Sequence, residues 1–270
     1  MANKSALINV MDAAVRKTAR RMLRDFGEVE QLQVSKKGPS DFVSAADLKA
    51  EETLRYELQK VRPDYGFLLE EGGEVKGKDL SNRWIIDPLD GTTNFLHGIP
   101  HFAISVALER DSEIFAGIIY DPTRDEMFYA EKGQGAYVND RRLRVSGRNS
   151  MADSVVATGI PHRGRCSPAE MARYNRELVA IMPEVAGIRR LGSAALDIAY
   201  VSAGRYEAYW ERGLQAWDIA AGLIIARESG AMVSETDLGE RMLKTGSILV
   251  ANGPLHGPMA TLLRKAHRAK

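Results

Sequence analysis

The hydrophobic pattern of the chain switches repeatedly between a helical period and short apolar runs. Apolar residues recur at helical spacing over 7–23, which predicts a first helix with one buried face and one basic, solvated face. A second helix is predicted after Asp47, with Leu48, Leu54, Leu58 and Val61 on its apolar face. Later helices are predicted over about 168–182, over 192–203, from 217 onward and from 255 onward.

Short apolar runs bounded by turn residues predict strands in both halves of the chain. Between 102 and 145 such runs alternate with polar turns, which predicts an antiparallel meander. Further strands are predicted at 66–69, 84–87, 155–158, 206–210, 231–234 and 247–251. Helices between and outside two groups of strands predict a layered α/β arrangement.

Composition and charge narrow the range of partners. The 270 residues, 44% hydrophobic and 27% charged, are enough for one large domain or two small, closely packed ones. With a formal net charge of +1 there is no overall basic field, so we expect no strong binding of nucleic acid. No apolar run approaches the roughly 20 residues that span a bilayer, so no membrane partner is expected. The single cysteine, Cys166, cannot form an internal disulfide, which favours a reducing, cytoplasmic location.

The stretch WIIDPLDGTTNF, residues 84–95, carries most of the candidate chemistry. Pro88 lacks a backbone donor and disfavours helix before it, which predicts that the strand ends at Asp87. Asp87 and Asp90 then lie three residues apart on a tight loop, followed by Gly91 and the Thr92 hydroxyl. Hard oxygen donors beside exposed N–H groups suit a divalent cation and a phosphate together.

Two other interpretations compete for the same stretch. Asp-Pro and Asp-Gly steps are common turn formers, so the two carboxylates could serve a turn alone. Phosphatases of the haloacid-dehalogenase type also place an aspartate after an apolar strand, but their two carboxylates are two residues apart. Because the spacing here is three, we do not interpret Asp87 as a covalent nucleophile.

Polar positions elsewhere also admit both a structural and a functional interpretation. Asp47 and Asp218 each lie near a predicted helix start, where an aspartate usually caps the helix. Glu70 and Glu71 precede a Gly-Gly turn, and at most one of them should face a given site. The small residues at 192–195 open a helix whose free N–H groups favour phosphate, or simply allow close packing.

Taken together, these motifs resemble the inositol monophosphatases, a family of lithium-sensitive, magnesium-dependent phosphatases. Residues 84–97 resemble the first family signature, and WDIAAG at 217–222, continuing to Gly230 and Ala231, resembles the second. The resemblance covers nearly the whole chain. It implies a five-layered αβαβα sandwich, as one domain over 1–270 with a half at 1–150 and a half at 151–270. It also implies a homodimer.

The resemblance assigns roles by position. It implies a first Mg²⁺ on Glu70, Asp87 and the Leu89 carbonyl, a second on Asp87, Asp90 and Asp218, and a third, weaker ion near Glu70. Asp47, Glu70 and Thr92 would orient the attacking water. The implied substrate contacts are Gly91, Thr92, Gly192, Ser193, Ala194, Glu211 and Asp218, with Glu211 on inositol hydroxyls. The chain departs from animal members at Gln215 and at 160–163.

The implied reaction is Mg²⁺-dependent hydrolysis of inositol monophosphate by activated water, without a covalent intermediate and with Li⁺ as inhibitor. Fructose-1,6-bisphosphate, histidinol phosphate and 3′-phosphoadenosine 5′-phosphate are alternative substrates for the same chemistry. An alternative of another class is a regulatory role in binding RNA or protein. The basic face of the first helix and the segment Arg141–Arg144 would serve it.

Overall fold

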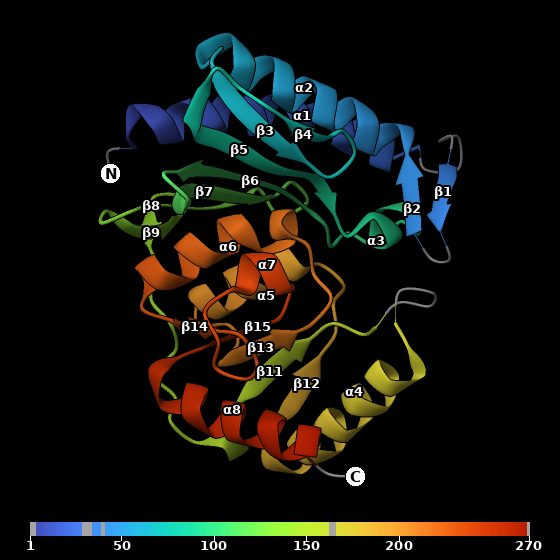
Figure 1. The fold of residues 1–270 in the computed structure, drawn as a ribbon, viewed down its shortest axis with the longest axis vertical. Coiled ribbons are helices and arrows are strands. Elements are labelled where there is room, and N and C mark those ends of the chain that lie inside the picture. The colour runs from blue at the N-terminus through green and yellow to red at the C-terminus, as the bar shows by residue number, and fades with distance from the viewer. Residues whose placement is uncertain (1–3, 29–33, 39–40, 162–165, 269–270) are drawn as a thin grey trace.

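The structure is a computed structural model that describes residues 4–28, 34–38, 41–161 and 166–268. Its helices and sheets stack in five alternating layers, the predicted αβαβα sandwich (Figure 1). Helices α1 and α2 cover one sheet, α5 and α6 lie between the two sheets, and α4 and α8 cover the other. These helices are α1 Ala6–Phe26, α2 Ala45–Val61, α4 Pro168–Ile181, α5 Ala194–Ser202, α6 Ala216–Ser229 and α8 Gly253–Arg268.

The first half of the chain builds the larger sheet, whose eight strands are ordered β10-β9-β8-β7-β6-β5-β3-β4. From β5 to β10 neighbouring strands pair antiparallel, which confirms the predicted meander, whereas β3 and β5 pair parallel. The strands are β3 Tyr65–Leu69, β4 Gly73–Val75, β5 Asp79–Asp90, β6 Ala103–Arg110, β7 Glu113–Asp121, β8 Glu126–Glu131, β9 Gly135–Val138 and β10 Arg141–Arg142.

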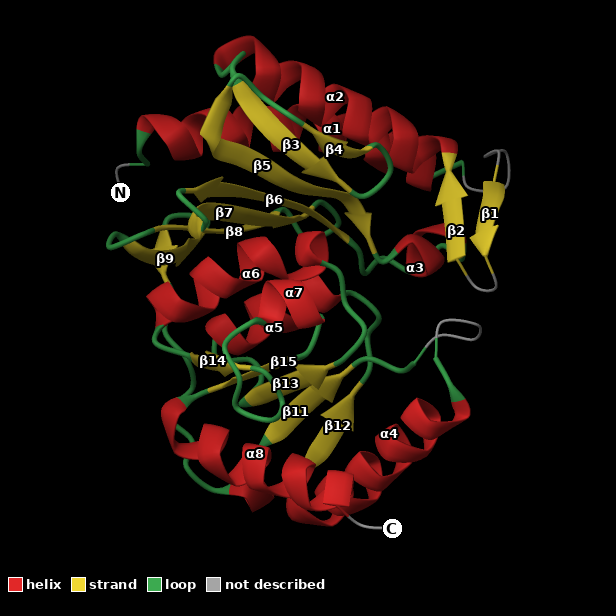
Figure 2. Cartoon of the chain, viewed as in Figure 1, coloured by secondary structure: helices red, strands yellow, loops and turns green. Residues whose placement is uncertain are grey.

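The second half builds a five-stranded sheet in the order β12-β11-β13-β15-β14 (Figure 2). Its strands are β11 Val155–Thr158, β12 Gly187–Arg189, β13 Ala208–Glu211, β14 Met232–Ser234 and β15 Ile248–Ala251. The remaining elements are β1 Val34–Gly38, β2 Asp41–Ser44, α3 Thr92–Leu96, α7 Met242–Thr245 and the 3₁₀ turns Met151–Asp153 and Met182–Glu184.

Helix α2 buries two of its four predicted apolar residues, Leu54 and Leu58, and exposes the other two. Leu48 is 53% exposed and Val61 is 41% exposed. Its buried apolar residues, Ala46, Ala50, Leu54 and Leu58, recur every four positions and form one row along the helix. Leu48 lies two positions from both Ala46 and Ala50, about 200° around the helix from the first, and therefore faces away from the sheet.

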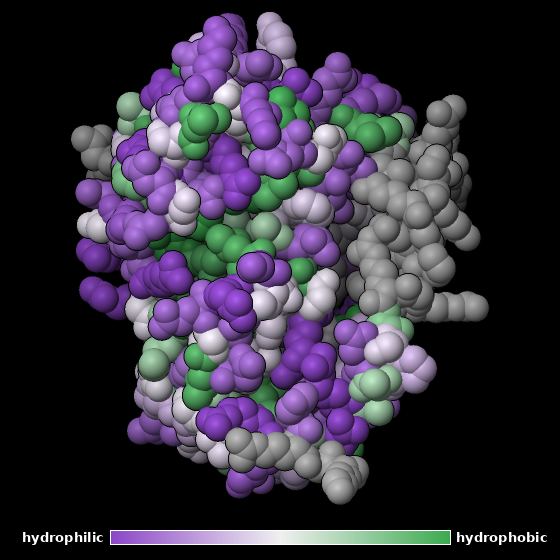
Figure 3. Space-filling view, viewed as in Figure 1, coloured by the Kyte–Doolittle hydropathy of each residue, from purple (hydrophilic) through white to green (hydrophobic). Residues whose placement is uncertain are grey.

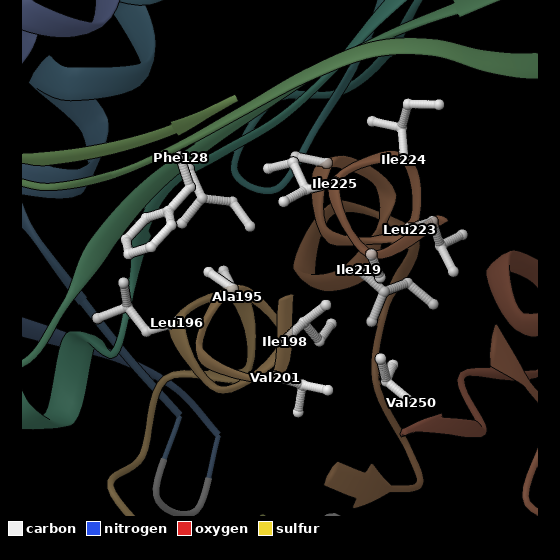
Figure 4. Packing of buried hydrophobic residues seen from close by; sticks show 14 of the residues in the cluster. Phe128, Ala195, Leu196, Ile198, Val201, Ile219, Leu223, Ile224, Ile225 and Val250 are labelled. Atoms are coloured by element: carbon white, nitrogen blue, oxygen red, sulfur yellow. The ribbon is translucent and has the colours of Figure 1, made fainter. Parts of the chain in front are cut away.

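The central helices join the two sheets through one continuous core. Helix α6 is buried over most of its length because a sheet lies on each side of it. Ile198 of α5 faces α6, and Phe128 and Val250 come from the larger and the smaller sheet (Figure 4). The visible face is mostly hydrophilic, with a smaller hydrophobic group at mid-height where α6 meets the larger sheet (Figure 3). This packing fixes the position of the strand ends that carry the candidate site.

Candidate functional site

A cavity of about 210 Å³ lies where the two halves of the chain meet. Its volume suits a small molecule rather than a folded partner. All the predicted site residues except Asp47 line it: Glu70, Asp87, Leu89, Asp90, Gly91, Thr92, Gly192, Ser193, Ala194, Glu211 and Asp218. The fold therefore brings the two predicted signatures to one place.

Strand β5 delivers the central motif to the cavity, although it does not end where predicted. The strand continues through Pro88 to Asp90. Its register against β6 shifts between Asp87 and Asp90, so one extra residue is accommodated in a bulge. A bulge tolerates the missing donor of Pro88 and turns side chains toward a site. Within it the Leu89 N–H donates to Asp87 Oδ1 at 2.9 Å.

Four carboxylates share this end of the cavity: Glu70, Asp87, Asp90 and Asp218. Burial raises the pKa of Asp87 well above its usual value, and the charges of the other three raise it further. Burial also raises the pKa of Asp90 to about 6 and the pKa of Asp218 well above its usual value. The cluster gathers negative charge that a cation would offset.

The donor chemistry fits a hard divalent cation, because carboxylate and carbonyl oxygens are the ligands that Mg²⁺ prefers. In the described ranges, no three carboxylate, histidine or cysteine side chains already form a group able to hold a metal ion. The oxygens are partly engaged within the protein. Asp90 Oδ2 accepts from Ser193 Oγ at 2.5 Å, and Asp218 Oδ2 accepts from the Gln215 N–H at 2.6 Å.

Thr92 links the cavity to Asp47. Its hydroxyl lies 3.1 Å from Asp47 Oδ1 and 3.0 Å from the Leu89 carbonyl, either of which can accept its proton. Asp47 is buried in the first turn of α2 rather than exposed in the cavity wall. Gly91, at φ 96°, sits where a Cβ would approach the His101 carbonyl to 3.1 Å, so the turn requires glycine.

The start of α5 forms the opposite wall and is tied to the motif from the first half. Asp90 Oδ2 also accepts from the Ala195 N–H at 2.8 Å. Asn94 Nδ2 donates to the carbonyls of Leu191 and His101, at 2.8 Å each. Asn94 was not predicted as a site residue, because only the fold brings Leu191 beside it. These bonds hold the two halves of the cavity in register.

Glu211 also lines the cavity, at the end of β13. Tyr209, two residues earlier on the same strand face, donates its hydroxyl proton to Glu211 Oε2. Burial raises the pKa of Glu211 to about 7, although the Tyr209 hydrogen bond lowers it. Gly159 leaves space for the Glu211 carboxylate, which a Cβ at that position would overlap.

Several wall residues were missed by the sequence analysis. They are Asp197, Arg190, Arg173, Tyr174, Glu177 and Arg212, all from the second half. Asp197 is buried, and its Oδ1 has no hydrogen-bond partner among the described residues. Ile160 and Pro161, from the segment that departs from animal members, also line the cavity, whereas 162 and 163 lie outside the described residues. Gln215 is exposed at the N-terminus of α6.

No helix in the described ranges combines the length and the apolar character that a bilayer span needs.

Comparison with known proteins adds independent information. The model of the inositol monophosphatase family matches residues 3–269. The chain is 54% identical over 267 residues to an inositol-1-monophosphatase of Mesorhizobium japonicum, with 99% of each chain covered. It is 40% identical over 248 residues to the Nus factor SuhB of Pseudomonas aeruginosa, with 91% of each chain covered.

A solved structure is similar over the same extent. The extragenic suppressor protein suhB from Bartonella henselae superposes with a TM-score of 0.93 and 50% sequence identity, over 97% of this chain and 99% of that one. The family match and the named relatives make the chain an enzyme, a phosphoric monoester hydrolase. The predicted resemblance is therefore confirmed: the chain belongs to the inositol monophosphatase family.

Proposed function

We propose that this phosphatase hydrolyses inositol monophosphate to inositol and phosphate in a Mg²⁺-dependent reaction. The observation that carries the proposal is that one cavity is lined both by an acidic group with Thr92 and by Glu211 from another strand. Glu70, Asp87, Asp90 and Asp218 form the acidic group, and Glu211 stands at the end of β13. A phosphate ester fits this lining when its phosphate faces the acidic group with cations present and its hydroxyls face Glu211.

The first Mg²⁺ is assigned to Glu70, Asp87 and the Leu89 carbonyl, and the second to Asp87, Asp90 and Asp218. A third, weaker ion is assigned near Glu70. When bound, the ions would supply Lewis acidity, which favours the attack of water at neutral pH and offsets the charge of the phosphate. The raised pKa values of Asp87 and Asp218 support this assignment, because carboxylates that repel one another gain most from a cation.

The remaining roles belong to side chains and backbone groups of the chain. The Thr92 hydroxyl, with Asp47 Oδ1 in reach of its proton, would accept a hydrogen bond from the attacking water. Glu70 would help to orient that water. The N–H groups at Gly91 and Thr92, and those at the start of α5, would bind phosphate oxygens. Asp90 and Asp218 would face the leaving oxygen, and Glu211 would accept hydrogen bonds from inositol hydroxyls.

Phosphate release tests the proposal across inositol 1-phosphate, fructose-1,6-bisphosphate, histidinol phosphate and 3′-phosphoadenosine 5′-phosphate. We expect preference for inositol 1-phosphate with Mg²⁺, inhibition by Li⁺, and a loss of about a thousandfold in kcat for Asp90→Asn, since metal ligation is worth several kcal/mol in the transition state. The exposed Asp153 provides a matched Asp153→Asn control with normal activity. Preference for another ester would move the substrate assignment, and full activity of Asp90→Asn would refute the metal assignment.

A second candidate is a regulatory role in binding RNA or protein. It is favoured by the relative named Nus factor SuhB, together with the exposed arginines Arg141, Arg142 and Arg144 around β10. A gel shift with RNA over a range of salt concentrations tests it, because phosphate contacts weaken steeply as salt rises. Salt-sensitive binding that is lost on replacing these arginines would support the regulatory role, and no shift would count against RNA.

The homodimer implied by the family resemblance is part of the same proposal. Light scattering after gel filtration tests it. A mass of twice the 29.8 kDa chain is expected. A monomer that retains full activity would refute it.

A further inference from the structure

One buried carboxylate contacts both sequence neighbours of Glu211. Glu177, on α4, accepts a hydrogen bond from Trp210 Nε1 on Oε2 at 3.2 Å. Its other oxygen, Oε1, lies 2.6 Å from Arg212 Nη1, an ion pair whose angle falls outside hydrogen-bond geometry. Glu177 thus holds the residue before Glu211 with one oxygen and the residue after it with the other.

The strand geometry makes this arrangement relevant to the cavity. Successive residues of a strand point to opposite faces. Trp210 packs in the core beneath α4 and α8, whereas Tyr209 packs in the central core and donates to Glu211. Glu211 is therefore held on one face by Tyr209, and its backbone is held from the other face through Glu177.

Burying the Glu177–Arg212 ion pair costs desolvation free energy, which argues against an incidental contact. The Glu177 side chain is 2% exposed and the Arg212 side chain 20% exposed. Burial raises the pKa of Glu177 and lowers the pKa of Arg212, so both charges have lost hydration. Buried pairs of this kind often contribute little net stability. Arg212 lines the same cavity as Glu211, its neighbour in sequence. Without Glu177, the Arg212 guanidinium would have two other acidic side chains as alternative partners, Asp237, whose charge already acts on it, and Glu211.

We propose that Glu177 is a positioning residue for recognition of the leaving group. It fixes the end of β13 against α4 and keeps Arg212 away from Glu211, so that the Glu211 carboxylate stays available to the hydroxyls of a polyol monophosphate. This inference rests on the proposed function, because it deepens the role given to Glu211. It predicts that Glu177 affects substrates with hydroxyls near the phosphate and not those without them.

The test compares Glu177→Gln with the wild-type enzyme on inositol 1-phosphate and on phenyl phosphate, which has no hydroxyls. We expect KM for inositol 1-phosphate to rise about tenfold or more, as expected for losing hydrogen bonds to a charged group, with kcat little changed. Both constants for phenyl phosphate should stay within about twofold, since the acidic end of the cavity is unaltered.

Glu207 offers a matched control at the other end of the same strand. It is buried directly before β13 and pairs with Arg148 at 2.9 Å, and its side chain is 1% exposed. Glu207→Gln likewise breaks the ion pair of a buried glutamate beside this strand, although its partner Arg148 is 57% exposed. It should lower the melting temperature and leave the KM values for both substrates unchanged. An equal rise of the inositol 1-phosphate KM in Glu207→Gln would overturn the positioning role.

The double variant Glu177→Gln, Arg212→Met separates positioning from simple loss of stability. With the guanidinium removed, residue 212 can no longer compete for the Glu211 carboxylate, so KM for inositol 1-phosphate should return most of the way to the wild-type value. A double variant as impaired as the single one, or a single variant that affects both substrates equally, would overturn the inference. If Glu177→Gln does not fold, the single variant Arg212→Met tests the inference. A KM for inositol 1-phosphate within about threefold of the wild-type value supports the inference, and a tenfold rise overturns it.

The wild-type enzyme separates this inference from the proposed function. If it hydrolyses phenyl phosphate and not inositol 1-phosphate, the proposed substrate is wrong and the inference falls with it. If it hydrolyses inositol 1-phosphate while Glu177→Gln behaves as the wild type on both esters, the inference alone is wrong.

Discussion

Single side chains around the cavity decide which part of a substrate is recognised. At Gly159 the missing side chain provides the space that the Glu211 carboxylate occupies. At Gly91 the missing side chain allows the left-handed turn after Asp90. Both glycines line the cavity and act through the absence of a side chain, Gly159 by leaving space and Gly91 by allowing a left-handed backbone.

Replacing Gly159 by alanine should displace Glu211, because the new Cβ would overlap its carboxylate. We expect KM for inositol 1-phosphate to rise about tenfold, since a hydrogen bond between a hydroxyl and a charged group is worth about 1.5–3 kcal/mol. Steady-state kinetics with phenyl phosphate as second substrate measures this. Gly147→Ala, where a Cβ meets no atom within 4 Å, is the control. Unchanged recognition of inositol 1-phosphate in Gly159→Ala would argue against a substrate role for Glu211.

His101 should make stability depend on pH. The ring is 5% exposed, and neither nitrogen has a hydrogen-bond partner among the described residues. Burial lowers its pKa from 6.5 to about 4, and the charge of Arg124 lowers it further. The folded state therefore favours the neutral ring. The contribution of the neutral His101 ring to the stability of the fold is complete above about pH 6.5 and is lost as the pH falls toward 4.

Urea unfolding at about pH 7.5 and pH 5 tests this effect. From pH 7.5 to pH 5 the free energy of unfolding of the wild-type protein should fall by up to about 2 kcal/mol more than that of His101→Leu, whose side chain cannot be protonated. Tyr200 packs edge-on against the His101 ring, with 6.0 Å between the ring centroids. Its near-ultraviolet circular dichroism therefore checks that the local packing survives the substitution. Equal losses in both proteins would show that His101 does not titrate in this range.

Helix α6 and strand β7 approach each other closely at a glycine. A Cβ at Gly117 of β7 would lie 2.8 Å from the Ala221 Cα of α6, which is backbone and cannot move aside cheaply. Gly117→Ala should therefore destabilise the protein by about 1–3 kcal/mol, the usual cost of overpacking. Chemical denaturation against Gly147→Ala measures the difference. A stability equal to that control would mean that the helix shifts without cost.

The sequence predicted the elements better than their ends and faces. The meander and the helix at 168–182 follow from local patterns, and the structure confirms them. The predicted end of β5 at Asp87 was wrong, because the bulge that accommodates Pro88 depends on pairing with β6. Leu48 was assigned to the wrong face of α2, since apolar character alone does not say which row meets the sheet.

For the candidate site too, the residues in local motifs could be predicted and those that depend on distant contacts could not. Asp87, Asp90 and Asp218 could be proposed because their motifs are local and resemble family signatures. Glu177 could not, because nothing in its own surroundings on α4 signals that it contacts Trp210 and Arg212. Pairings between distant elements appear once the fold is known.

At the scale of the whole molecule, one hydrophobic core connects both halves. Ile85 and Phe128 from the larger sheet belong to the same buried cluster as Ile198 and Val250 from the second half. We therefore expect residues 1–150 and 151–270 to unfold together, as the predicted single domain. Scanning calorimetry should give one transition whose calorimetric and van't Hoff enthalpies agree. Two separate transitions would contradict the single-domain prediction.

The proposed reaction depends above all on Mg²⁺ bound by the acidic group of the cavity. Calorimetric titration of the metal-free protein with MgCl₂ tests this directly, with inorganic phosphate present and with Asp90→Asn as the comparison. We predict saturable binding of at least two ions per chain in the wild-type protein and loss of the second ion in Asp90→Asn. No saturable heat in the wild-type protein, or identical isotherms for both proteins, would contradict the account.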